Sequence, residues 1–366
     1  MARRRSLSSR VCPLVAAWGL CSSSCSPGGL ADEATIGSVR ILASEADKPY
    51  AHPGDRVHLQ LLAFDGRPSK PAPMKLYWLP FVCDNPPDDA YYACFAQLGR
   101  GRGDAGGGGG AGGPDGGAGG LGLLQPGTDL SPLLPSGPSY DVTMPADAVT
   151  AHAPTPGTPV PYGLTIVFNI ACAGHVELLP IVPGTTNPQA LPVGCFDADH
   201  NQLGPDDYVF GFTRVYAYSD ANMTNTNPTI DYVDVLGQKM SVWPASGGYS
   251  TPGFRTPHCK EERRENCPKV KVGPVVPSSS WEANPEDVDK GNVRHEQIWA
   301  DFFSTFGNFT SSARLLYDVT RGSIGDASTT DNEFQAPADP GSGFIWFVVH
   351  DNRGGATWAT IPVTVN

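Results

Sequence analysis

Cysteine and histidine are the residue types of this chain whose spacing could support chemistry. The sequence holds nine cysteines and eight histidines. Two histidines follow cysteines closely, in Cys172-x-x-His175 and Cys195-x4-His200, and such intervals occur among zinc ligands. The alternative is local pairing of neighbouring cysteines, each disulfide adding on the order of 3 kcal/mol to stability. We favour three disulfides, which would join Cys83 with Cys94, Cys172 with Cys195, and Cys259 with Cys267.

A second metal-binding pattern is the alternation of Asp197, Asp199 and Asn201, which places oxygen ligands at every other position. Calcium takes oxygen ligands from loops of this kind. Calcium loops also have glycine at the sixth position and glutamate at the twelfth, where this chain has Gln202 and Tyr208. We therefore expect a turn between strands, with Ca²⁺ as the alternative, and we predict no other cofactor.

Catalytic motifs are incomplete throughout the chain. His295-Glu296 begins a zinc-protease pattern, but Trp299 stands where the second histidine is needed. His175-x-Glu177 starts a deaminase pattern that lacks its pair of closely spaced cysteines. No Gly-x-Ser-x-Gly motif is present. The sequence thus favours a non-enzymatic role in binding, adhesion or envelope structure. The alternative is a secreted hydrolase or carbohydrate-active enzyme, which could depend on a metal.

The charge balance excludes one class of partner. The 37 acidic residues outnumber the 25 lysines and arginines, and the formal net charge is −12. Nucleic-acid-binding proteins usually carry a basic surface instead. We therefore expect no nucleic-acid partner.

The first 24 residues have the pattern of an export signal. Four arginines and no acidic residue within 1–10 precede an apolar run at 11–20. That run is shorter than the roughly 20 residues of a membrane-spanning helix, and no later segment is long enough. We expect residues 1–24 to be a signal peptide that directs the chain out of the cytoplasm.

The residues after the apolar run, Cys21-Ser-Ser-Ser-Cys25-Ser-Pro-Gly-Gly, resemble the lipobox of bacterial lipoproteins. The resemblance implies cleavage before Cys25, lipidation of Cys25, a tether over 25–35 and an outer-membrane location. Loss of the leader and lipidation of Cys25 would leave six cysteines, an even number for pairing. An ordinary secretory signal is the alternative, and the protein would then be periplasmic or extracellular.

The remaining sequence has the pattern of an all-β protein. Short apolar and β-branched runs alternate with Pro, Gly, Asn and Asp, and no long amphipathic helix is evident. The runs form two groups, which predict two tandem β-sandwiches over 36–220 and 229–366. The expected strands are 39–42, 57–64, 74–82, 140–144, 164–172 and 208–218 in the first group, and 230–236, 270–276, 297–303, 314–319, 344–350 and 357–365 in the second.

Two tryptophans and one hairpin give the sandwiches an immunoglobulin-like character. Trp78 and Trp299 each lie in an apolar strand, where immunoglobulin-like domains bury a tryptophan between their sheets. At the C-terminal end, Asp351-Asn-Arg-Gly-Gly355 separates two apolar strands, which predicts a β-hairpin. This segment resembles the closing hairpin of bacterial polycystic-kidney-disease-type domains. The resemblance implies an immunoglobulin-like fold.

Residues 99–138 interrupt the first sandwich. The segment is rich in glycine, including five in succession at 106–110, and has little apolar surface to bury. We expect a disordered insertion. The loop just before it carries Tyr91 and Tyr92, whose rings could stack on a sugar or pack on a protein. A protein or glycan ligand is therefore expected, together with a membrane reached through the lipid anchor.

Overall fold

The computed structural model is an all-β structure. Its helical segments are short, and within the described residues no helix has the length and apolar character to cross a membrane. The predicted signal peptide, Cys25 and residues 99–124 lie outside the described residues. The helical segments are η1 (Pro87–Asp89), α1 (Ala93–Leu98), η3 (Ser131–Leu133), α2 (Ala148–Ala151) and η5 (Ser278–Ser280). The structure describes residues 33–98, 125–153, 160–180, 191–245, 247–261, 266–289, 291–319, 323–324, 330 and 332–366.

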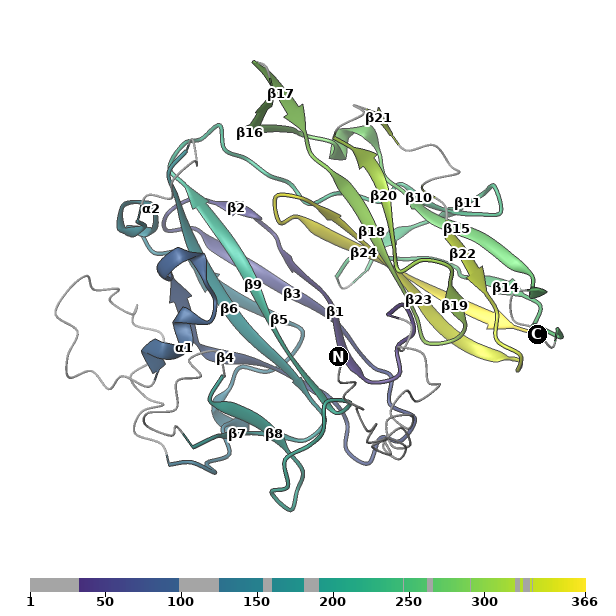
Figure 1. Cartoon of the computed structure of the whole chain (residues 1–366), viewed down its shortest axis with the longest axis horizontal. Helices are drawn as coiled ribbons and strands as arrows, with labels where there is room; N and C mark the ends of the chain where they lie inside the picture. Colours follow the sequence, from purple (N-terminus) through teal and green to yellow (C-terminus); the bar gives the residue numbers. More distant parts are fainter. Residues whose placement is uncertain are drawn as a thin grey trace, which may run out of the picture. The chain divides into compact units, whose positions relative to one another are not determined.

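The N-terminal strands form two sheets and a separate hairpin (Figure 1). One sheet has the order β1-β3-β5, the other has the order β2-β9-β6-β4, and β7 pairs with β8. Trp78, Leu59 and Val167 lie in the core that the two sheets share. The strands are β1 (Val39–Ala46), β2 (Tyr50–Ala51), β3 (Arg56–Asp65), β4 (Lys75–Asp84), β5 (Ser139–Thr143), β6 (Tyr162–Cys172), β7 (His175–Leu178), β8 (Val193–Phe196) and β9 (Tyr208–Tyr218).

Strand β6 is buried along its whole length because both faces of its sheet are covered. Val167 points into the core shared with the β1-β3-β5 sheet, whereas Ile166 and Phe168 belong to a second core on the opposite face. Side chains alternate between the faces of a strand, so a strand covered on both sides is apolar throughout. Leu130 and the β7–β8 hairpin contribute to this second core.

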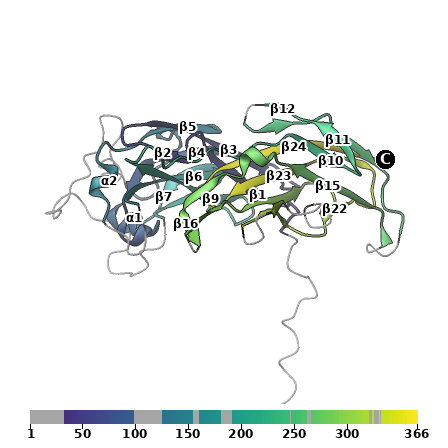
Figure 2. The ribbon, with the colours of Figure 1, turned by 90° about the horizontal axis from the view of Figure 1, so that it is seen from above.

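The C-terminal strands form a second sandwich. One sheet has the order β11-β10-β15-β22-β19, and the other has β12-β13-β24-β23-β18-β20-β21, with β14 also paired to β24. Figure 2 shows β10, β15 and β22 of the first of these sheets from above. The strands are β10 (Tyr232–Val235), β11 (Gln238–Ser241), β12 (Trp243–Pro244), β13 (Tyr249–Ser250), β14 (Phe254–Thr256), β15 (Lys269–Val275), β16 (Ala283–Asp289), β17 (Asn292–His295), β18 (Ile298–Ser304), β19 (Asn308–Phe309), β20 (Ala313–Asp318), β21 (Ser323–Ile324), β22 (Asn332–Gln335), β23 (Gly341–Asp351) and β24 (Ala356–Val365).

The predicted strands all correspond to strands of the structure, and the all-β immunoglobulin-like class is confirmed. The C-terminal hairpin is also confirmed, because β23 and β24 pair along their length across a turn in which Gly354 has φ +98°. Within the described residues, no sheet combines strands from before and after residues 219–231. The boundaries 36–220 and 229–366 stay a prediction for independently folding domains.

Two expectations are wrong in detail. Trp78 is fully buried, but Trp299 is only partly buried, because Ile298, Ala300 and Phe302 take the inward positions of β18. Residues 125–138 of the predicted disordered insertion are packed, with Leu130 and Leu134 in the core. A few leucines suffice to order this end of a glycine-rich segment because they bury apolar surface that the glycines lack.

Candidate functional site

Two groups of residues could carry function, and the first is built on the β7–β8 hairpin. Cys172, at the end of β6, forms a disulfide with Cys195 of β8. The other two predicted pairs also form, Cys83 with Cys94 and Cys259 with Cys267. The zinc-thiolate alternative is therefore wrong at Cys172 and Cys195, whose sulfurs are bonded to each other.

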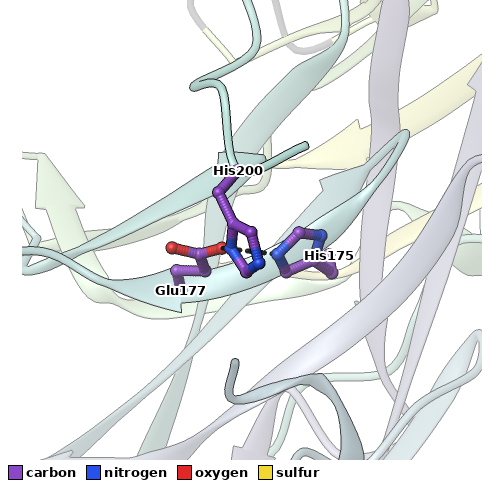
Figure 3. A group of neighbouring side chains, drawn as sticks. All are labelled: His175, Glu177 and His200. Carbon is purple, nitrogen blue, oxygen red and sulfur yellow. Dashed lines mark hydrogen bonds and ion pairs between the residues drawn. The ribbon is translucent and has the colours of Figure 1, made fainter. Parts of the chain in front are cut away.

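The histidines that follow these two cysteines nevertheless meet (Figure 3). His175 and Glu177 are two positions apart on β7 and point to the same side of the strand. The Glu177 Oε1 atom lies 2.5 Å from His175 Nε2 and 2.5 Å from His200 Nδ1. The Glu177 side chain is only 4 % exposed, whereas that of His200 is 66 % exposed. A buried carboxylate thus contacts two imidazoles, and one of them, that of His200, is exposed on the surface.

His200 is held in place by the acidic turn of the sequence. The Asp197 carboxylate accepts hydrogen bonds from the backbone N–H groups of Asp199 and Asn201, both at 2.9 Å. These bonds, first of all the one from Asn201, hold the pKa of Asp197 below its usual range. The Asp197 carboxylate, a candidate calcium ligand, is therefore already hydrogen-bonded within the turn, and Asp199 takes part in the turn through its backbone N–H. Calcium binding stays the alternative to a simple turn.

The second group lines a pocket of about 500 Å³ beside strand β9. The even-numbered residues of β9 share one face, and Phe212, Arg214, Tyr216 and Tyr218 line the pocket from that face. A volume of this size is typical of small-molecule sites. The remaining lining residues are Ser44, Tyr50, Tyr162, Thr213, Glu286, Asn352, Arg353 and Gly354.

Glu286 binds two of the tyrosines that line this pocket, which we call the tyrosine pocket. The hydroxyls of Tyr50 and Tyr218 donate hydrogen bonds to its carboxylate at 2.9 and 3.2 Å, and the two rings lie 4.6 Å apart. Burial is the main cause that raises the pKa of both hydroxyls, and the nearby carboxylate adds to it. Both phenols therefore remain protonated donors at neutral pH.

Arg353 forms another wall and comes from the turn of the C-terminal hairpin. Its guanidinium donates to Glu296 Oε1 at 2.5 Å and to Glu282 Oε2 at 3.0 Å, and lies 5.2 Å from the centre of the Tyr50 ring. Glu296 is fully buried, and its Oε2 has no hydrogen-bond partner among the described residues. Burial, reinforced by Asp351 and opposed by Arg353, raises the pKa of Glu296 to about 7.

The aromatic surface continues outside the pocket. Tyr91 stacks on Phe212 at 4.8 Å between ring centroids, and Tyr92 packs edge-on against Tyr91. Arg214 lies over the Phe212 ring at 4.8 Å and has no ion-pair partner in the described part of the chain. The loop tyrosines expected to contact a ligand are thus exposed at the rim of the tyrosine pocket.

The protease-like residues His295 and Glu296 make other contacts. The His295 ring packs on Trp281 at 4.4 Å, and Glu296 is bound to Arg353, so the protease-like pattern forms no metal site. Sequence reasoning overlooked the aromatic alternation along β9. It considered His175-x-Glu177 only as an incomplete deaminase pattern, although a two-residue spacing aligns two ligands on one side of a strand.

Comparisons with known proteins give little further information. No protein-family model matches the chain, and a search of curated proteins finds no match. Among solved structures, a chain described as the D0-D1 domain of Intimin is 10 % identical in sequence, with a TM-score of 0.15. That match covers 88 % of this chain and 98 % of the other.

Proposed function

We propose that this protein is an exported, lipid-anchored envelope protein that acts by binding, without catalysis, and that its ligand occupies the tyrosine pocket. The observation that carries the proposal is the convergence of aromatic rings and polar groups on one cavity of about 500 Å³. Concave sites of this size with a few placed polar groups are the usual form of ligand sites.

The chemistry of the tyrosine pocket favours an acidic saccharide. Tyr216 is a partly exposed aromatic side chain of the lining, against which the apolar face of a sugar can pack. The Phe212 ring is already in contact with Tyr91 and Arg214 and holds these two side chains beside the pocket. Asn352 supplies side-chain N–H groups for hydrogen bonds to sugar hydroxyls. Arg214 provides a cation at the mouth that no carboxylate of the described residues neutralises. A carboxylate on the sugar would complete that pair.

The carboxylates of the tyrosine pocket argue against a glycosidase. Most glycosidases place two carboxylates on either side of the bond that they cleave. Glu286 is the single carboxylate among the described residues that line the cavity, and it is already bound by two tyrosine hydroxyls. The His175–Glu177–His200 cluster shares no residue with the lining. The pocket therefore supports binding rather than hydrolysis.

Export and anchoring rest on the N-terminal sequence and on the cysteines. Disulfides form and persist outside the reducing cytosol, and the structure pairs six cysteines. The lipobox-like residues around Cys25 would supply the anchor. Mass spectrometry of the mature N-terminus tests this part. A diacylated or triacylated Cys25 is expected, and an unmodified N-terminus at any other residue would contradict the anchor.

A glycan array tests the binding role. We expect retention of acidic oligosaccharides in preference to neutral ones, and loss of at least tenfold in affinity in Phe212→Ala and Arg214→Ala. Phe210→Ala is the matched control, because Phe210 lies on the same face of β9 and is exposed but does not line the tyrosine pocket. Equal loss in all three variants, or no glycan binding by the parent protein, would contradict the proposal.

A further inference from the structure

We propose that His175, Glu177 and His200 bind a divalent first-row transition-metal ion, with Zn²⁺ as the best match. The ligand atoms of the three residues lie within 4.8 Å of one another. This site is separate from the tyrosine pocket, and its existence does not depend on the ligand proposed there.

The three ligand atoms need little movement to receive an ion. Zinc binds histidine nitrogen and carboxylate oxygen at about 2.0–2.2 Å, so two ligands of a tetrahedral ion lie roughly 3.4 Å apart. Each imidazole nitrogen now lies 2.5 Å from Glu177 Oε1. Withdrawal of each ring by roughly 1 Å would open the centre of the cluster to a metal.

The backbone around the cluster is fixed before any ion binds. The Cys172–Cys195 disulfide joins the strand that precedes His175 to the strand that precedes His200. Asp197 closes the turn that carries His200, which has the left-handed φ of +61°. Few non-glycine residues adopt this conformation, and such positions concentrate at functional sites. The fold therefore confines the motion to the side chains.

The ligand types indicate which ions fit. Two imidazoles and one carboxylate suit zinc and neighbouring transition metals, whereas Ca²⁺ and Mg²⁺ prefer oxygen ligands alone. The exposed ring of His200 places the cluster at the surface, so an ion can enter from solvent and water can fill the fourth position. The neighbouring cysteines contribute no thiolate, because they are joined in the disulfide.

The competing interpretation is a hydrogen-bond network that needs no metal, in which the imidazoles satisfy the buried Glu177 carboxylate. The two interpretations differ in their response to metal. A network gives no saturable binding, whereas a metal site binds one equivalent and makes the folded protein more stable.

Calorimetric titration of the chelator-treated protein with Zn²⁺ tests the site, and Co²⁺ gives a second readout through its visible absorption bands. We expect one equivalent to bind and the melting temperature to rise. In His200→Ala and Glu177→Gln the affinity should fall by about a hundredfold or more, since loss of outer-shell groups alone costs 10–100-fold. His58→Ala is the control, because His58 also pairs with a carboxylate, Asp141, at 3.0 Å but belongs to no cluster with a second histidine among the described residues.

Folding of each variant is checked by its circular dichroism and its melting temperature without metal. His200→Ala removes a mostly exposed ring, so it keeps the test valid even if Glu177→Gln unfolds. Absence of Zn²⁺ and Co²⁺ binding in the parent protein would overturn the proposal. Binding that is unchanged in His200→Ala, or equally weakened in His58→Ala, would also overturn it.

Discussion

Glu296 is a buried carboxylate that bonds to Arg353 in the wall of the tyrosine pocket, and its replacement tests how its charge affects the stability of the folded protein. It is fully buried, bonds to Arg353 through Oε1 and leaves Oε2 without a hydrogen-bond partner among the described residues. Loss of hydration outweighs the attraction of Arg353 and raises the pKa of Glu296 to about 7 from its ordinary 4.5. The ionised side chain is therefore costly to the folded state.

The pKa gives the sign and size of the effect on stability. Between pH 4.5 and 7 the folded protein holds a proton on Glu296 that the unfolded chain has lost, so the free energy of unfolding falls as pH rises through this range. At 1.36 kcal/mol per pH unit, the difference from 4.5 to about 7 corresponds to about 3 kcal/mol. Water penetration and relaxation reduce such penalties, so we expect between about 1 and 3 kcal/mol.

Glu296→Gln gives the carboxylate a neutral replacement of the same shape. We expect the variant to match the parent at pH 5, where Glu296 is protonated, and to exceed it in stability by about 1–3 kcal/mol at pH 8. The assay is denaturant unfolding at pH 5, 6, 7 and 8, with the same m-value in both proteins as the condition for comparison.

A loss of stability in Glu296→Gln at pH 8 would show that the ion pair with Arg353 stabilises the fold. If the Arg353–Glu296 ion pair stabilised the ionised form, Glu296→Gln would leave a buried guanidinium short of a partner and cost about 3–5 kcal/mol at pH 8. Glu45→Gln is an independent comparison, because burial and then Asp47 raise the pKa of Glu45 to about 7 as well. A Glu296→Gln variant that is less stable than the parent at pH 8 would refute the reasoning.

Two further predictions concern the scaffold. Replacing both Cys172 and Cys195 by serine should lower the free energy of unfolding by about 3 kcal/mol, measured in denaturant, because their sequence separation of 23 closes a sizeable loop in the unfolded chain; an unchanged midpoint would contradict it. Trp78→Ala should cost about 3–5 kcal/mol, whereas Trp299→Ala should cost clearly less, because only Trp78 is fully buried; equal losses in a melting experiment would contradict this assignment.

Much of the fold could be predicted because its signals are local. The residues Asp351 to Gly355 favour a turn by their own backbone preferences, and the apolar runs on either side pair as β23 and β24. The error at Trp299 arose from the choice of face. An apolar strand gives the alternation of its side chains, but which set points inward depends on the sheet packed against it.

The sites were harder to predict because they join distant segments. Tyr50 meets Glu286, 236 residues further along the chain, and Arg353 reaches Glu296 from a hairpin turn. No local pattern specifies such contacts. The histidine cluster was partly predictable, since the cysteine pairing that brings His175 and His200 together follows from the sequence, although the buried position of Glu177 does not.

The central claim is that the tyrosine pocket is a binding site for an acidic saccharide. Its most direct test is a crystal structure of the protein with the acidic oligosaccharide that binds best on the array. The account predicts density for a sugar ring against Tyr216, with its carboxylate at Arg214. Density for the sugar at another surface, with the tyrosine pocket filled by water alone, would contradict the claim.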